Sequence, residues 1–389
     1  MAELIHTENG WRYKQEKVHL LRAKWHDYFS PAIYMLTLTS VGRESIFGRL
    51  DGDVNNASIK LTTLGEIVAK EIERIPEYKG FECAEIFKYV VMPDHVHILL
   101  YVHERLNHPL GYYVSWFKKQ CSDKAQELAN PQGLTSASAT CSPMTDVGSA
   151  LAVKSASISQ PTLHRSKAHS TPLIFDAEYH DRILLHNGQL DNMRRYIADN
   201  PRRLWLKRAN PDLFRIHQNV SSAELEFTAL GNMFLLDYPN KAVIQCSRSL
   251  TQQQIDEQKK SALIQADCGV GFVSAGISEG EKKICRALRE AGYPLIILLK
   301  DGFPASDDPN SKYFKPQGVY FEACAKGKLL LLEPKLEAFE HSEIVSAVNK
   351  KHCGLPHDTL RYRFLALNEI AHLINNATTS LPNRSCSWR

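Results

Sequence analysis

Pro93-Asp94-His95-Val96-His97-Ile98-Leu99-Leu100 is the stretch that decides how the first half of this chain folds. Its β-branched and large apolar residues predict a buried strand. Because side chains alternate between the two faces of a strand, His95 and His97 point to the same side while Val96 points into the core. Two neighbouring imidazoles on one face are better explained by a shared divalent metal ion than by packing.

The residues around this strand alternate between strand and helix patterns. β-Branched and aromatic runs predict strands, whereas apolar residues three and four apart predict helices. In chain order we expect a strand at residues 32–39, a helix at 62–73, strands at 81–87 and 89–92, the histidine strand as far as 102, and a helix at 110–128. A further helix at 189–199 is expected to end where Asn200 precedes Pro201.

Composition changes at about residues 129–171, where Ser, Thr, Ala and Pro dominate and apolar periodicity disappears. This pattern predicts a flexible insertion within one domain. We therefore expect a first domain at residues 1–218, which contains the insertion, and a second at 219–389.

Tyr196 and Asn200 are four residues apart on the predicted helix and so share one face. A phenol, an amide oxygen and two imidazoles are the groups that a metal-assisted phosphoryl transfer needs. The metal would polarise a scissile phosphate, and Tyr196 would attack phosphorus to give a covalent phosphotyrosine and a free 3′-hydroxyl. The alternative is that Tyr196 packs on the helix surface and Asn200 caps the helix.

Basic residues gather around this tyrosine, although the formal net charge of the 389-residue chain is only +4. Next to a candidate nucleophile, such a run predicts contact with a phosphate backbone. The candidate DNA contacts are Lys118, Lys119, Arg194, Arg195, Arg202, Arg203, Lys207 and Arg208.

The two motifs together resemble a known family. Tyr89-Val-Val-Met-Pro-Asp-His-Val-His-Ile-Leu-Leu and Tyr196-Ile-Ala-Asp-Asn-Pro are similar to the signatures of single-tyrosine HUH transposases. The Asn-Pro form is most similar to the REP-associated tyrosine transposases, and the resemblance covers roughly residues 28–214.

This resemblance implies an α+β, ferredoxin-like HUH nuclease domain with an antiparallel sheet and the histidines on a central strand. It also implies Mg²⁺ or Mn²⁺ on His95, His97 and Asn200, Tyr196 as the nucleophile, and hairpin or palindromic single-stranded DNA as substrate. Asp94 departs from the Asn that is common before the first histidine. The insertion leaves open whether the tyrosine helix docks in its own subunit or in the partner of a homodimer.

The second half has the pattern of a different domain. Apolar strands that alternate with helices predict an α/β, Rossmann-like, doubly wound parallel sheet. We expect strands at residues 242–249, from 271, at 293–300 and at 328–333, a helix at 279–291, and tail helices at 342–349 and 360–375.

In such sheets, ligands bind at the carboxyl ends of strands and anions at helix amino termini. The candidate nucleotide- or phosphate-binding residues are Ser247, Arg248, Ser274, Gly276, Ser278 and Gly280. The pattern resembles the Rossmann-like domain of Smf-type DNA-processing proteins and related nucleotide sensors, which implies a nucleotide or single-stranded DNA phosphate as ligand. Ser274-Ala275-Gly276 stands where that family has Ser-Gly-Gly, and small residues at strand ends are also typical of plain tight turns.

Nine cysteines without a C-x-x-C pair argue against a disulfide framework and against a structural zinc module. The polar amino terminus lacks the apolar core of a signal peptide, and no apolar stretch has membrane-spanning length. We expect a cytoplasmic protein with no membrane partner.

Three functions compete. The first is a metal-dependent single-stranded DNA endonuclease and strand transferase, and the second is a catalytically silent hairpin-DNA-binding protein. A complete set of His95, His97, Tyr196 and Asn200 argues against the silent binder. The third is a nucleotide-sensing module fused to an HUH nuclease, which ligand-dependent cleavage would identify. A relaxase or rolling-circle initiator usually places the tyrosine before the histidines or supplies further metal-binding histidines.

Overall fold

The structure is a computed structural model that describes residues 4–7, 10–13, 23, 25–129, 174–303 and 318–377. Two compact units make up the chain: an N-terminal unit, His19–Trp205, and a C-terminal unit, Leu206–Arg389 together with Met1–Val18. The expected boundary between residues 218 and 219 falls inside strand β9, His217–Ser222. The expected insertion lies outside the described residues beyond Ala129.

The N-terminal unit is built on a four-stranded antiparallel sheet in the order β6-β7-β3-β8. Its main elements are β3 (Ala32–Thr39), α1 (Thr63–Glu73), β6 (Ala84–Val91), β7 (His95–Val102), α2 (Leu110–Ala129), β8 (His180–Leu184) and α3 (Gln189–Ala209). A hairpin of β4 (Gly48–Asp51) and β5 (Ser58–Leu61) lies between β3 and α1 in the chain. Thr62 caps α1 by accepting the N–H of Gly65, as its sequence position predicts.

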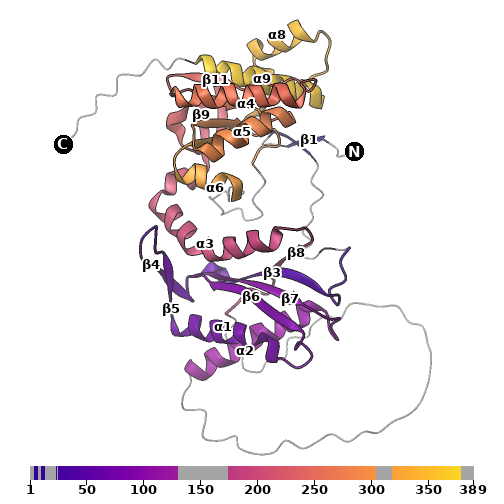
Figure 1. Ribbon diagram of the computed structural model, residues 1–389, viewed down its shortest axis with the longest axis vertical. Coiled ribbons are helices and arrows are strands. Elements are labelled where there is room, and N and C mark those ends of the chain that lie inside the picture. The colour runs from indigo at the N-terminus through magenta and orange to yellow at the C-terminus, as the bar shows by residue number, and fades with distance from the viewer. Residues whose placement is uncertain are drawn as a thin grey trace, which may run out of the picture. The chain divides into compact units, whose positions relative to one another are not determined.

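Alternation along β7 separates two layers. One set of its side chains joins the main core against α1 and α2: Val96, Ile98, Leu100 and Val102. Leu99 faces the other way and packs with Met35 and with Ile197 of α3. Figure 1 shows α1 and α2 on one side of the sheet and α3 on the other. His95 and His97 share the parity of Leu99, so they lie on the α3 side.

Two strands expected at residues 81–87 and 89–92 form the single strand β6. Its pairing with β7 shifts register between Ile86 and Lys88. Such a bulge interrupts the period-two alternation, which is why the sequence pattern suggested a break.

The expected end of α3 at Asp199 is wrong, because the helix continues through Pro201 to Ala209. An internal proline removes one backbone donor and costs about 3 kcal/mol. Side-chain bonds stabilise the turns on either side of it. Asn200 Nδ2 donates to the Tyr196 carbonyl over 2.8 Å, and Arg202 Nε lies 2.6 Å from Asp199 Oδ1.

The C-terminal unit contains a six-stranded mixed sheet in the order β11-β12-β13-β14-β10-β9. The strands are β9, β10 (Leu225–Gly231), β11 (Lys241–Val243), β12 (Gly271–Ser274), β13 (Leu295–Leu298) and β14 (Leu329–Pro334). The helices are α4 (Gln252–Asp267), α5 (Glu279–Ala291), α6 (Gly318–Ala325), α7 (Leu336–Glu340), α8 (Ser342–Lys351) and α9 (Leu360–Asn376). β1 (Leu4–Thr7) and β2 (Gly10–Tyr13) form a separate antiparallel pair.

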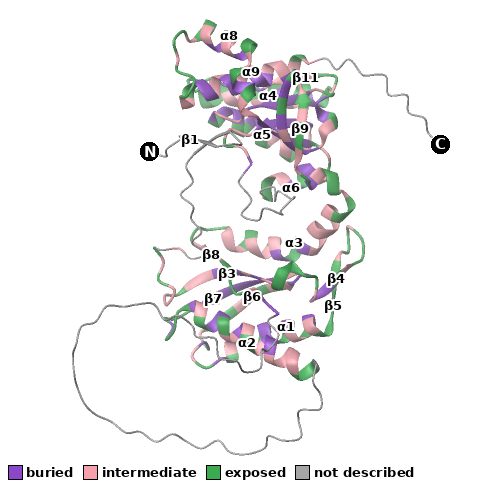
Figure 2. Cartoon of the chain, turned by 180° about the vertical axis from the view of Figure 1, so that it is seen from behind, coloured by how far each residue is buried: buried purple, intermediate pink, exposed green. Residues whose placement is uncertain are grey.

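The expected doubly wound topology is wrong for this sheet. β11 to β14 are parallel and follow one another without a reversal of order, so there is no switch point among these four strands. The connecting helices α4, α5 and α6 all pack on one face, with Leu295 and Ile297, and α8 and α9 cover the other, with Ile296 and Leu298. The residues of β12, β13 and β14 are therefore all buried. Figure 2 colours the chain by burial.

Within the described ranges, no helix is long and apolar enough to span a bilayer. The seven cysteines in those ranges are all free thiols.

Candidate active site

His95 and His97 lie side by side on β7, with their ring centroids 4.8 Å apart. Each ring has a hydrogen bond at Nδ1. His95 Nδ1 lies 2.7 Å from an Asp94 carboxylate oxygen, and His97 Nδ1 lies 2.8 Å from the Thr37 hydroxyl. A partner at Nδ1 fixes the orientation of an imidazole that binds metal through Nε2, and metal-ligating histidines nearly always have one.

Thr37 is a site residue that the sequence analysis missed. It is the cross-strand partner of His97 in the pairing of β3 with β7, and such partners share a face. The same register places Thr39 opposite His95 and His180 of β8 opposite Thr37. The sequence contains one signal for these threonines. Residues alternate along β3, and buried Leu38 separates Thr37 from Thr39, which places both threonines on the opposite face.

The half-buried Asp94 carboxyl supplies negative charge beside His95. Burial raises the pKa of Asp94, but the hydrogen bond and charge of His95 and the charge of Arg43 outweigh it, so that the pKa lies below its usual value. Asp94 is therefore a carboxylate at neutral pH, which suits a residue that orients a metal-binding imidazole.

Tyr196 reaches the histidines from α3. Its ring centroid lies 5.5 Å from that of His97. The neighbouring Ile197 is fully buried against Met35 and Leu99, and this packing fixes the helix on the sheet. Asn200, one turn further on, is buried and uses its side-chain nitrogen to donate to the Tyr196 carbonyl. The amide oxygen is the Asn200 atom that can act as a metal ligand.

These donors fit a divalent ion that keeps part of its water shell. Two imidazoles and an amide oxygen are compatible with Mn²⁺ or Mg²⁺ when substrate phosphate and water complete the coordination. In the part of the chain that the structure describes, no three His, Cys, Asp or Glu side chains form a metal-binding group. A metal ion on His95 and His97 would therefore need further ligands of another kind, such as an amide oxygen, water or a phosphate.

Two of the predicted cations lie on this face. The Arg203 guanidinium carbon is 5.5 Å from the centre of the Tyr196 ring. That of Arg194 is 4.8 Å from the centre of the Phe87 ring.

The other predicted cations of α3 have varied neighbours. Arg202 makes a two-pronged contact with Asp199, at 2.6 and 3.2 Å, and Arg195 donates to Asn192 over 2.7 Å. In the C-terminal unit, Lys207 lies over the Phe321 ring at 5.9 Å and Arg208 is exposed.

Lys118 and Lys119 are not brought to the histidine face, because α2 covers the opposite side of the sheet. Lys118 Nζ donates to three consecutive carbonyls, those of Asp176, Ala177 and Glu178, at 2.7, 2.9 and 3.0 Å. It therefore stabilises the segment that leads into β8.

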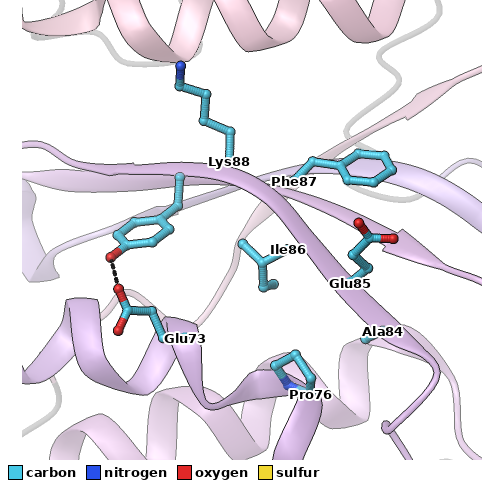
Figure 3. Close-up of a pocket in the computed structure, with 8 residues that line it drawn as sticks. Glu73, Pro76, Ala84, Glu85, Ile86, Phe87 and Lys88 are labelled. Atoms are coloured by element: carbon cyan, nitrogen blue, oxygen red, sulfur yellow. Dashed lines mark hydrogen bonds between the residues drawn. The ribbon is translucent and has the colours of Figure 1, made fainter.

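A groove of about 500 Å³ lies against the edge strand β6 (Figure 3). It is lined by Glu73, Pro76 and residues 84–89. Figure 3 shows Lys88 pointing away from α1, whereas the Glu73 carboxylate of α1 takes the hydrogen bond of Tyr89 at 2.6 Å. The groove contains none of the predicted site residues, and its two carboxylates, Glu73 and Glu85, oppose a phosphate ligand.

In the C-terminal unit, a buried carboxylate lies among the residues expected to hold a phosphate. Glu281 is 2% exposed and accepts the N–H groups of Ile277 at 2.6 Å, Cys246 at 3.2 Å and Ser278 at 3.3 Å. With Ser278 it forms the capping box at the start of α5. The Glu at this capping position in the sequence was the signal for this arrangement.

The remaining residues of the predicted phosphate site have turn and packing contacts. The Ser274 hydroxyl accepts the N–H of Gly276 at 3.1 Å. A Cβ at Gly280 would lie 3.1 Å from that of Cys246, so α5 and the loop after β11 approach closely there. Ser247 bonds to Ser249 over 2.8 Å, and Arg248 is exposed.

Comparison with known proteins gives limited likeness. No family model and no curated protein matches the chain. A REP-associated tyrosine transposase bound to a REP hairpin is 14% identical over 48% of this chain and 77% of its own, with a TM-score of 0.26. DNA processing protein A from Helicobacter pylori is 19% identical over 41% of this chain and 65% of its own, also with a TM-score of 0.26. At these scores we draw neither fold nor activity from either structure.

Proposed function

We propose that the N-terminal unit is a metal-dependent single-stranded DNA endonuclease and strand transferase with Tyr196 as its nucleophile. The observation that carries this proposal is the grouping of three rings. The ring centroid of Tyr196 lies 5.5 Å from that of His97, and the ring centroids of His97 and His95 are 4.8 Å apart. The sheet order β6-β7-β3-β8 supports it, because that order and antiparallel pairing are those of a ferredoxin-like domain with the histidines on a central strand.

The chemistry follows from these groups. A divalent ion held by His95, His97 and Asn200 would polarise the scissile phosphate and neutralise its charge. The Tyr196 oxygen attacks phosphorus, its proton passes to water, and the bond from phosphorus to the 3′-oxygen breaks. The 3′-oxygen takes up a proton, so the products are a 5′-phosphotyrosine and a free 3′-hydroxyl. Attack of a 3′-hydroxyl on the phosphotyrosine reverses the step and joins strands.

Arg203 adds positive charge beside this reaction. Its guanidinium lies 5.5 Å from the centre of the Tyr196 ring and 4.0 Å from the Asp199 carboxylate, so part of its charge is already compensated. The hairpin form of the substrate and the involvement of a homodimer rest on the motif resemblance alone.

Cleavage of labelled hairpin DNA tests the proposal. Strands labelled at either the 5′ or the 3′ end are incubated with Mn²⁺ or EDTA and separated on denaturing gels. We expect the 3′-labelled fragment to remain on the protein and the 5′-labelled fragment to be released, only with Mn²⁺. Tyr196→Phe and His97→Ala abolish both products, whereas Tyr112→Phe, on the opposite side of the sheet, retains them. If the Tyr196→Phe variant still cleaves the DNA, water is the nucleophile and the proposal is wrong.

The alternatives give different results in the same assay. A silent hairpin binder shifts the DNA on native gels and forms no product. A nucleotide-sensing fusion cleaves only when nucleotide is added. The carboxylate of Glu281, which holds three backbone donors at the candidate nucleotide site, weighs against the sensing role.

A further inference from the structure

A row of ring side chains continues along the α3 side of the sheet beyond the histidine pair. The His103 ring lies 4.0 Å from the Tyr101 ring, and Tyr101 lies 5.8 Å from Phe87. The Arg194 guanidinium covers Phe87 at 4.8 Å. We call these four residues the ring row.

The ring row lies on the same face of the sheet as the candidate active site, towards the other end of β7. Tyr101 and His97 are four residues apart on β7, so they share a face and lie about 13 Å apart along the strand. Phe87 and Tyr196 border the same apolar cluster beneath α3. Buried Leu99 lies between His97 and Tyr101 on this face and packs under Ile197 of α3, so the ring row is a separate surface beyond that contact.

Exposure and charge favour a nucleic acid as the occupant. The side chains of His103 and Arg194 are 44% and 42% exposed, and Lys88 beside the bulge is also exposed. The nearby carboxylates have partners: Glu85 lies 2.8 Å from the His103 ring nitrogen, and Asp191 lies 3.9 Å from Arg194. Accessible rings combined with an arginine are the chemistry that binds unpaired bases by stacking and cation–π contact.

We propose that the ring row is a stacking platform that holds unpaired bases of single-stranded DNA on the sheet face that carries the candidate active site. The choice of DNA rests on the proposed function. The stacking itself requires neither Tyr196 nor a metal ion, so it is measured separately from cleavage.

Binding of two probes in EDTA tests the platform. The probes are a fluorescein-labelled oligo(dT) and an abasic oligomer of equal length, which keeps the phosphates and lacks the bases. Tyr101→Leu and His103→Ala are each expected to weaken oligo(dT) binding by about 5- to 150-fold, with little effect on the abasic probe. Tyr101→Phe retains binding. Tyr112→Ala is the matched control, because Tyr112 is 46% exposed on α2, on the other side of the sheet.

Unchanged oligo(dT) binding by both variants would overturn the proposal of a stacking platform. An equal loss of affinity for oligo(dT) and for the abasic probe would also overturn it, because it would indicate a contact with phosphates only. If circular dichroism shows that Tyr101→Leu is unfolded, the test rests on His103→Ala, because His103 is exposed. If wild-type protein forms no covalent product yet these variants lose oligo(dT) affinity, the proposed function fails and the platform stands.

Discussion

The ring centroid of Tyr196 lies 5.5 Å from that of His97, although one residue comes from a helix and the other from a strand far earlier in the chain. Burial of Ile197 against Met35 and Leu99 holds this relationship in place. The approach of the tyrosine to the histidines is therefore a property of how α3 packs on the sheet.

Thr37 is expected to act through His97 as a positioning residue. Thr37→Val preserves shape and removes the hydrogen bond to Nδ1, whereas Thr37→Ser restores it. We expect Thr37→Val to weaken Mn²⁺ binding by about 10- to 100-fold, since partners of metal-ligating histidines have effects of that size. Titration calorimetry without DNA makes the measurement, and Thr37→Ser should stay near wild type. Wild-type Mn²⁺ affinity in Thr37→Val would remove Thr37 from the site.

Lys118 is expected to matter for stability and not for DNA. Lys118→Met leaves three carbonyls without their donor, and we expect the free energy of unfolding to fall by about 1–3 kcal/mol. Lys119→Met, one position on and exposed, should change it by less than about 0.5 kcal/mol. Urea denaturation measures both, and oligo(dT) affinity should be unchanged in both. A loss of DNA affinity confined to Lys118→Met contradicts this assignment.

Asp27 provides a pH prediction in the N-terminal unit. The hydrogen bond from Arg105, together with those from the Phe29 N–H and the Ser30 hydroxyl, lowers the pKa of Asp27 from 3.8 to about 2. Because the pKa is lowered in the folded state, the resulting stability is present above pH 3.8 and is lost as pH falls towards 2. Arg105→Ala should return the pKa towards 3.8 in a carboxyl-detected NMR titration. An unchanged pKa in that variant would show that the arginine is not the main cause.

Glu281 is expected to stabilise the C-terminal unit by holding the loop after β11 against the loop before α5. Glu281→Gln replaces a charged acceptor of three backbone N–H groups by a neutral amide, and we expect a loss of about 1–3 kcal/mol in unfolding free energy. Glu279→Gln is the matched control, because its side chain is 79% exposed two positions away. Thermal and urea unfolding compare the two. Equal unfolding free energies of the two variants would contradict this stabilising role of Glu281.

Local sequence patterns predicted much of the fold. The histidine strand, the capped helix α1 and the helix α5 follow from period-two alternation, a cap and helical spacing, all of which are local signals. The continuation of α3 past Pro201 and the single bulged strand β6 were missed, because tertiary packing and cross-strand register override the local breaks there. The order of the parallel strands β11 to β14 is likewise not encoded in the periodicity of the sequence.

The candidate site was predictable to a similar degree. Alternation alone placed His95 and His97 on one face, and a spacing of four joined Tyr196 to Asn200. Thr37 required the register between β3 and β7. The role of Lys118 depends on which backbone carbonyls lie close to α2 in the folded protein. The sequence does not contain this information, so Lys118 was predicted to be a DNA contact.

Peptide mass mapping of the covalent product tests the central claim most directly. Wild-type protein incubated with hairpin single-stranded DNA and Mn²⁺ is digested with nuclease and protease, and the site of the residual nucleotide is read by tandem mass spectrometry. We predict a 5′-phosphotyrosyl adduct on Tyr196 and none in Tyr196→Phe. An adduct on another residue, or cleaved DNA with no adduct at all, would contradict the account.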